Sequence, residues 1–146
     1  MSLVSNKKAH LNYEILEKFE AGIELLGFEV KAIKNNQGSL EAAHVGVRGG
    51  EAFLLNFDLP PYQAKNTPES YDRVRARKLL LTKKEIKYLA DEGGKKGIAT
   101  IPLSIFLKGI KIKVDLALAR GKKKFDKRES LKKKDADREI RREMKH

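Results

Sequence analysis

The stretch IATIPLSIFLKGIKIKVDLALA, residues 98–119, is the strongest indication of how this chain is expected to fold. Its second half alternates apolar and polar side chains, and a period of two with one polar face is typical of a half-buried antiparallel strand. Lys108-Gly109 separates the two halves and supplies a turn. The stretch therefore predicts a β-hairpin, whose return strand directs one set of side chains to the core: Ile110, Ile112, Val114, Leu116 and Leu118.

Further strands are expected on the N-terminal side of this hairpin. Residues 45–57 predict a second hairpin, because Gly49-Gly50 lies between two apolar runs and allows the positive φ angles of a tight turn. Residues 13–26 form an apolar stretch that we interpret as a strand broken or bent near Ala21-Gly22. Residues 77–81 predict one more short strand.

Two short helices and one long loop complete the pattern. One helix is predicted over residues 28–34. Another is predicted to begin after Thr82, which has the spacing of a capping box with Glu85, and to end at Gly93-Gly94. Residues 58–76 contain most of the prolines and no clear periodicity, so we expect a long loop of the kind that is often functional.

The sum of these elements predicts an all-β fold. A small closed antiparallel β-barrel of the oligonucleotide-binding (OB-like) type, with two or three peripheral short helices, accounts for the strand count. A two-layer α+β sandwich is the competing architecture. We expect residues 1–119 to form the barrel domain and residues 120–146 to form a basic tail, because the tail has too few apolar side chains to build a core and is expected to be disordered or partly helical until bound.

The charge of the chain restricts its partners. The sequence has 32 Lys and Arg against 20 Asp and Glu, a formal net charge of +12. A charge so far from zero is typical of proteins that bind nucleic acid, an anionic membrane surface or an acidic protein. The chain contains no cysteine, which excludes disulfides and thiolate zinc sites. No apolar run approaches the ~20 residues of a membrane span, so a cytoplasmic location is expected.

No motif of catalysis or metal binding stands out. The three histidines, His10, His44 and His146, are far apart in the sequence and lack metal-ligand spacing. Glu20 and Glu24 lie in or beside an apolar stretch, and a metal-dependent nuclease would need such carboxylates together with others such as Asp115. Nothing else in the sequence favours a nuclease, so we expect no enzyme activity, no cofactor, no metal and no small-molecule substrate.

Basic runs are the stronger signal. Arg73, Arg75, Arg77 and Lys78 alternate along an extended stretch and would place cations on one side. Residues 121–128 interleave Phe125 with lysines and an arginine. Cations neutralise phosphates, and an aromatic ring offers a stacking surface to a base. These runs predict nucleic-acid binding.

Several short motifs follow one another through the chain: Asn6-Lys7-Lys8-Ala9, Phe19-Glu20-Ala21-Gly22-Ile23, Gly27-Phe28-Glu29-Val30-Lys31, Arg75-Ala76-Arg77-Lys78-Leu79-Leu80-Leu81, Ala117-Leu118-Ala119-Arg120-Gly121-Lys122-Lys123 and Asp126-Lys127-Arg128. In this order and spacing they resemble a known family, the SsrA-binding proteins (small protein B) of bacterial trans-translation. The resemblance implies a monomeric RNA-binding barrel that binds the tRNA-like domain of transfer-messenger RNA and delivers it to ribosomes stalled without a stop codon.

The resemblance also implies site residues. The surface for transfer-messenger RNA would include Glu20, Lys31, Arg75, Arg77, Lys78 and Leu80. The ribosomal decoding centre, formed by small-subunit ribosomal RNA, would be engaged by Gly121, Lys122, Lys123, Phe125, Asp126, Lys127 and Arg128. Beyond these, a tail helix in the empty mRNA channel would present one apolar stripe made of Ala136, Ile140 and Met144.

Three alternative functions predict different properties of the protein. Another ribosome-associated barrel, a ribosomal protein or an initiation factor, would share the charge and the fold. A metal-dependent nuclease would cleave RNA and lose that activity on Glu20→Ala or Asp115→Ala. Membrane-surface binding through the tail would need a broader apolar face than one narrow stripe.

Overall fold

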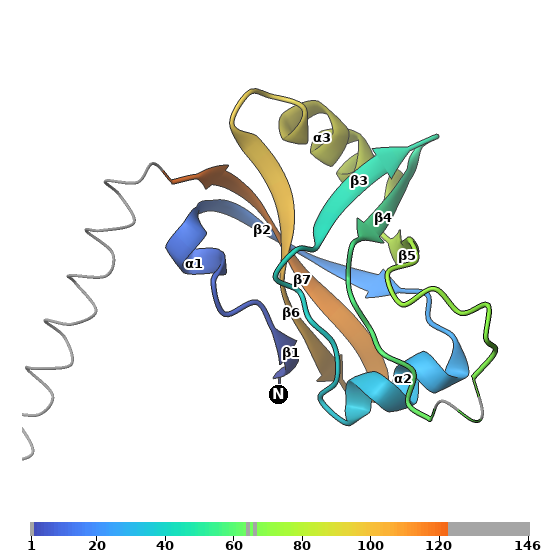
Figure 1. The fold of residues 1–146 in the computed structure, drawn as a ribbon. Helices are drawn as coiled ribbons and strands as arrows, with labels where there is room; N and C mark the ends of the chain where they lie inside the picture. Colours follow the sequence, from blue (N-terminus) through green and yellow to red (C-terminus); the bar gives the residue numbers. More distant parts are fainter. Residues whose placement is uncertain (1, 64, 66, 123–146) are drawn as a thin grey trace, which may run out of the picture.

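The computed structural model describes residues 2–63, 65 and 67–122. Seven strands form one sheet in the order β1-β6-β7-β2-β5-β4-β3, and every pairing is antiparallel (Figure 1). The strands are β1 (Ser2–Ser5), β2 (Tyr13–Ile23), β3 (His44–Arg48), β4 (Glu51–Leu55), β5 (Arg77–Leu80), β6 (Ile98–Lys108) and β7 (Lys111–Gly121). The helices are α1 (Ala9–Asn12), α2 (Gly27–Lys34) and α3 (Lys83–Gly93).

The sheet is open, so the predicted closed barrel is not confirmed, although the mostly antiparallel β-fold is. Its two edge strands in the described part of the chain are β1 and β3, which do not pair with each other. Instead α3 lies beside β3 (Figure 1). Leu89 of α3 is buried, and the helix borders one groove together with β3 and the start of β6. The helix therefore packs where hydrogen bonds between β3 and β6 would close a barrel.

The hairpin predicted over residues 98–119 is present as β6 and β7. The two strands pair from Ile98 opposite Arg120 to Lys108 opposite Lys111. Ile110 was predicted to face the core, and this is wrong. It lies in the turn after Gly109, beyond the end of the pairing, and is 93% exposed.

The strict inward and outward alternation of β7 holds only in its first half. Val114 and Leu116 belong to the main core, with Ile33, Leu54 and Phe57 among its other members. Ala117 and Ala119 on the opposite face are also buried, because Ala9 of α1 and Ile101 of β6 pack over them. A second small core therefore covers the outer face at this end of the sheet.

Strand β2 is continuous, so of the break or bend predicted near Ala21-Gly22 the break is wrong. The strand pairs with β7 from Tyr13 to Gly22 and contains one irregularity, between Ile15 and Glu17. Gly22 also pairs with Leu80 of β5, so the strand is held from both sides at the position where the sequence suggested a bend. The pairing compensates for the weak strand propensity of Ala and Gly.

The predicted helices and the first hairpin are confirmed. Helix α3 begins after Thr82, whose Oγ1 accepts a hydrogen bond from Glu85 N–H at 3.1 Å. Gly49 and Gly50 form the β3–β4 turn with φ of 58° and 74°. Strand β1 and helix α1, at the N-terminal end, were not predicted, because each is only 4 residues long and shows no periodicity.

The ordered sheet extends slightly beyond the expected domain boundary at residue 119. Strand β7 runs to Gly121, which pairs with Tyr13, and Lys122 N–H donates to Asn12 O at 2.9 Å. The division into a domain over residues 1–119 and a tail over residues 120–146 remains a proposal. No helix in the described ranges is long and apolar enough to cross a membrane.

Candidate functional site

Strand β5 divides the predicted basic run between two faces of the sheet. Arg77 and Leu79 are buried, whereas Lys78 is partly exposed and Leu80 is 50% exposed. Successive side chains on a strand point to opposite faces, so only Lys78 and Leu80 lie on the outer face. The alternation of cations along this stretch therefore does not produce a continuous cationic row.

Arg77, which was predicted to hold phosphate, is buried in this structure. Its side chain is 0% exposed, and its five N–H groups donate to five protein acceptors. The acceptors are Glu29 Oε2, Phe57 O, Arg75 O, Tyr71 Oη and Arg73 O, at 2.7 to 3.3 Å. The guanidinium also lies 5.2 Å from the centroid of the Phe57 ring. No donor remains for an RNA phosphate in this arrangement.

Glu29 is the anion at the centre of this network and was not among the predicted site residues. The carboxylate is fully buried and accepts from the guanidinium groups of Arg75 and Arg77, and from Leu26 N–H at 2.8 Å. Burial raises the pKa of Glu29, but the Arg75 hydrogen bond, the Leu26 N–H and the Arg77 charge together lower the pKa below its ordinary value. Glu29 is therefore held as an anion.

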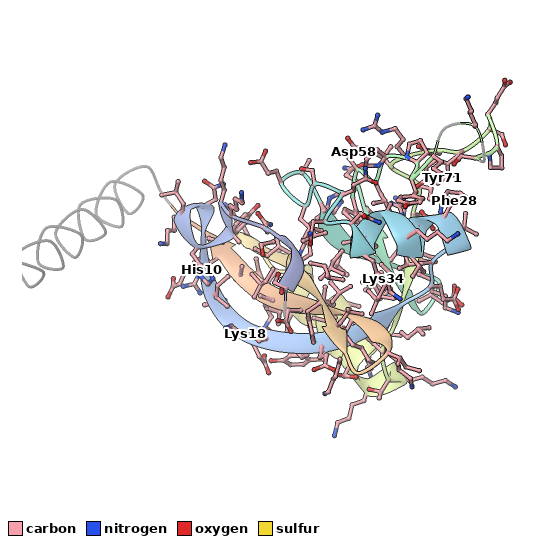
Figure 2. The ribbon with its side chains drawn as sticks, turned by 90° about the horizontal axis from the view of Figure 1, so that it is seen from below. His10, Lys18, Phe28, Lys34, Asp58 and Tyr71 are labelled. Carbon is pink, nitrogen blue, oxygen red and sulfur yellow. The ribbon has the colours of Figure 1, made fainter. Side chains whose placement is uncertain are left out.

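The network fastens the long loop to helix α2. Tyr71 lies in the loop, and its hydroxyl is 3.0 Å from both Glu29 Oε2 and Leu59 O. Its ring packs edge-on against Phe28, with 4.8 Å between centroids, and Figure 2 shows the two rings together beside α2. Asp58 lies close by in the same view and pairs with Arg73 at 3.0 Å. Arg75 also pairs with Glu29 in this network, and 29% of its side chain remains exposed.

Leu80 lies over Gly22 on the outer face of the sheet. The two residues are directly paired between β5 and β2. A Cβ atom at position 22 would come within 3.2 Å of Leu80 Cβ and 3.3 Å of Leu80 Cδ1. Because Gly22 has no side chain, the Leu80 side chain can pack against its backbone, and Leu80 remains half-exposed.

Acidic partners offset some of the exposed cations of this face. Glu20 of β2 pairs with Lys108 of β6 at 3.1 Å, and its carboxylate is partly exposed. Lys78 pairs with Glu51 at 3.1 Å, and this hydrogen bond raises the pKa of Lys78. Lys31 is exposed on α2, and within the described residues no carboxylate pairs with it.

No metal centre is formed by the described residues. Among them, no three His, Asp or Glu side chains come together in a way that could hold an ion. Glu20 and Asp115 are paired across β2 and β7, but Glu20 engages Lys108 and Asp115 is 3.4 Å from Ser104 Oγ.

Comparison with known proteins assigns the chain to a family. The family model described as SmpB protein matches residues 3–146. The chain belongs to the SmpB family. Among curated relatives, the SsrA-binding protein of Caldicellulosiruptor saccharolyticus is 48% identical over 143 residues, covering 98% of this chain and 90% of the relative. The SsrA-binding protein of Gloeobacter violaceus is 45% identical over 142 residues, covering 97% and 93%.

A solved structure supports the same assignment. A chain from the work described as "tmRNA-SmpB: a journey to the center of the bacterial ribosome" is 37% identical to this chain. The two match with a TM-score of 0.69 over 87% of this chain and 92% of the solved one. SmpB proteins are RNA-binding proteins and not enzymes, so the prediction of a non-enzymatic protein is confirmed.

The SmpB-like tail positions are only partly described. Gly121 ends β7, and Lys122 Nζ donates to His10 O at 2.9 Å. The other predicted tail residues lie outside the described part of the chain: Lys123, Phe125, Asp126, Lys127, Arg128, Ala136, Ile140 and Met144. Their roles remain predictions.

One signal in the sequence could have revealed Glu29. It is the third residue of α2 and accepts from the N–H of Leu26, which precedes the helix. An acidic side chain in a first helical turn is favoured by the helix dipole. Its burial depends on residues 71, 75 and 77 of the loop and β5, which are more than 40 positions away in the chain.

Proposed function

We propose that this SmpB-family protein binds the tRNA-like domain of transfer-messenger RNA and delivers it to stalled ribosomes. The observation that carries the proposal is the match, over 87% of the chain, to a protein described with tmRNA and the bacterial ribosome. Relatives that are more than 40% identical over nearly the whole chain carry the name SsrA-binding protein. The net charge of +12 suits a polyanionic partner.

The RNA surface of the proposal lies on the outer face of β2 and β5. Leu80, half-exposed over Gly22, offers an apolar surface to an unstacked base or a ribose. Lys78 and Lys31 offer positive charge to phosphates. Glu20 offers acceptors to a base edge or a 2′-hydroxyl, provided that Lys108 releases part of the carboxylate.

Arg75 and Arg77 have a different role in this proposal. Since both guanidinium groups pair with the buried Glu29, they hold the long loop and β5 in place. Arg77 acts only by positioning Lys78 and Leu80, which follow it in β5. Arg75 has an exposed part that can also reach RNA.

The tail carries the ribosomal half of the proposal. We assign Gly121, Lys122, Lys123, Phe125, Asp126, Lys127 and Arg128 to the decoding centre, and Ala136, Ile140 and Met144 to a helix in the empty mRNA channel. Residues 120–146 contain thirteen Lys and Arg against six Asp and Glu, a positive charge that suits ribosomal RNA. Circular dichroism of a tail peptide tests folding on binding, because a strongly helical free peptide would contradict it.

A binding titration tests the RNA half of the proposal. The full-length protein is titrated with the tRNA-like domain of transfer-messenger RNA at two salt concentrations, with excess ordinary tRNA as competitor. We expect tight binding that survives the competitor and moderate salt. Binding that collapses equally for both RNAs as salt rises would show only a polycationic surface. The alternative of a ribosomal protein or initiation factor has no support from the family match.

A further inference from the structure

A groove at the end of the sheet that carries the β6–β7 turn reaches from Leu80 to that turn. It is lined by Gly22, Leu80, Ile110, Lys111 and Lys113, and by the apolar side chains of Ile23, Leu25, Val30 and Ile112. The turn lies at the same end of the molecule as α2 (Figure 1). None of the turn residues belongs to the surface proposed above.

Ile110 is exposed to a degree that the fold does not require. Its side chain is 93% exposed, more than any other large apolar side chain of the described residues. A turn between antiparallel strands usually carries polar residues, which cost nothing to hydrate. An isolated exposed apolar residue is ordinary, but here Ile110 borders the same groove as the half-exposed Leu80.

The turn also concentrates positive charge. Lys108 and Lys111 are directly opposite each other in the β6–β7 register, and like charges in such pairs are destabilising. Glu20 neutralises Lys108 at 3.1 Å. Within the described residues, Lys111 and Lys113 form no ion pair. Two cations therefore remain available beside the apolar groove.

These features suit one chemical class of partner. A nucleotide that is neither paired nor stacked combines an apolar base face with an adjacent phosphate charge. We propose that the groove between Leu80 and Ile110 receives one unpaired nucleotide of the tRNA-like RNA, with Lys111 and Lys113 at its phosphates. This inference rests on the proposed function and extends its RNA site from β5 and β2 to the β6–β7 turn.

Binding measurements separate the apolar and ionic parts of this inference. Ile110→Ser in the full-length protein removes only an exposed side chain, so folding is unaffected. We expect roughly five- to thirtyfold weaker binding of the tRNA-like domain, as for the removal of one apolar side chain from an interface, with an unchanged salt dependence. Lys111→Gln and Lys113→Gln should each lower the slope of log affinity against log salt by roughly 0.7 to 0.9 for each phosphate that is no longer neutralised.

Matched controls come from positions away from the groove. Leu16→Ser removes another exposed apolar side chain, near the opposite end of β2. Lys96→Gln removes an exposed lysine that precedes β6, at the opposite end of that strand from Lys108. Both controls should bind like the wild type. Equal weakening by Ile110→Ser and Leu16→Ser would overturn the inference, and so would an unchanged affinity of Ile110→Ser.

Crosslinking identifies the occupant. Ile110 is replaced by the photoreactive residue p-benzoylphenylalanine, and the crosslinked nucleotide is mapped on the tRNA-like domain. A crosslink to a single-stranded position supports the inference, and a crosslink to a base-paired stem overturns it. If the wild-type protein fails to bind this RNA in competition with tRNA, the proposed function itself has failed. If the wild type binds but the groove variants do not weaken binding, only the inference has failed.

Discussion

Arg77 and Glu29, which are 48 positions apart in the chain, meet as a fully buried ion pair 2.7 Å apart. The pair joins helix α2 to strand β5 beneath the face that is proposed to bind RNA. Breaking a buried pair on one side leaves an uncompensated charge in the interior, which costs far more than losing an exposed pair. The stability of the face that is proposed to bind RNA therefore depends on Arg77 and Glu29, which are buried beneath it and do not contact RNA in this proposal.

Glu29→Gln should lower the free energy of unfolding by about 3–5 kcal/mol, because it leaves the buried Arg77 without its anion. Urea denaturation at pH 7 measures the change. Glu41→Gln is the matched control, since it breaks only the exposed pair with Lys8 and should cost less than about 1 kcal/mol. Similar losses of unfolding free energy in the two variants would show that the buried pair stabilises the fold no more than an exposed pair does.

The same carboxylate predicts a dependence of stability on pH. The pKa of Glu29 is lowered in the folded protein, so its contribution is fully present above the pKa in the unfolded chain, about 4.3. This contribution is lost as the pH falls through the lower pKa of the folded state. Between pH 7 and pH 3, the wild type should lose more stability than Glu29→Gln in urea denaturation. Parallel pH profiles would contradict this prediction.

Arg77→Lys distinguishes a structural role from a phosphate-binding role. Lysine keeps the charge but cannot reproduce five N–H donors in a planar arrangement, so buried acceptors lose their partners. We expect the free energy of unfolding to fall by about 2 kcal/mol or more, measured in urea. Lys78→Gln, the neighbouring exposed position, should retain stability while weakening RNA binding. A fully stable Arg77→Lys variant would refute the structural assignment.

Gly22→Ala should weaken binding of the tRNA-like domain by displacing Leu80. The added Cβ would be 3.2 Å from Leu80 Cβ, so the leucine side chain has to move by a few tenths of an ångström. We expect about two- to tenfold weaker binding and a loss of stability of about 1 kcal/mol. Gly27→Ala provides the comparison, because nothing lies within 4 Å of the corresponding Cβ. In Gly27→Ala, RNA binding should be unchanged and the free energy of unfolding should stay the same or rise by up to about 1 kcal/mol.

Deletion of residues 123–146 should separate the two halves of the proposed function. Residues up to Lys122 are held by β7 and by the hydrogen bonds of Lys122 to His10 and Asn12, so the sheet is retained. We expect binding of the tRNA-like domain to remain within about threefold after allowance for the removed charge, measured at moderate salt. Tagging of stalled chains in a reconstituted translation system should be abolished. Loss of RNA binding altogether would show that the domain and tail do not divide in this way.

The local elements were predictable where one physical signal dominated. The Thr82–Glu85 capping box and the Gly49-Gly50 turn were confirmed at their predicted positions, because both depend on residues close in sequence. The predicted strand break at Gly22 was wrong, since pairing with Leu80 and Lys113 holds the strand from both sides. Propensity at one residue could not anticipate two neighbouring strands.

The candidate site was predictable in part. Leu80 and Lys78 lie on the exposed face as a site on β5 requires, whereas Arg77 from the same run is buried. A two-residue period places alternate side chains on opposite faces, but it does not say which set faces inward when both contain cations and leucines. On the inner face, Leu79 packs in the main core and Arg77 pairs with the buried carboxylate of Glu29.

Patterns between near neighbours along the chain were enough to predict the β6–β7 hairpin, the helices α2 and α3, and the concentration of positive charge at the C-terminal end, and short motifs carried the resemblance to the family that the comparisons then showed. Three further properties emerged only in the folded molecule. The sheet is open, Arg77 forms a buried ion pair with Glu29, and the exposed Ile110 lines the same groove as Leu80. Each of these depends on residues distant in sequence, because burial and charge pairing are set by the neighbours that folding brings together.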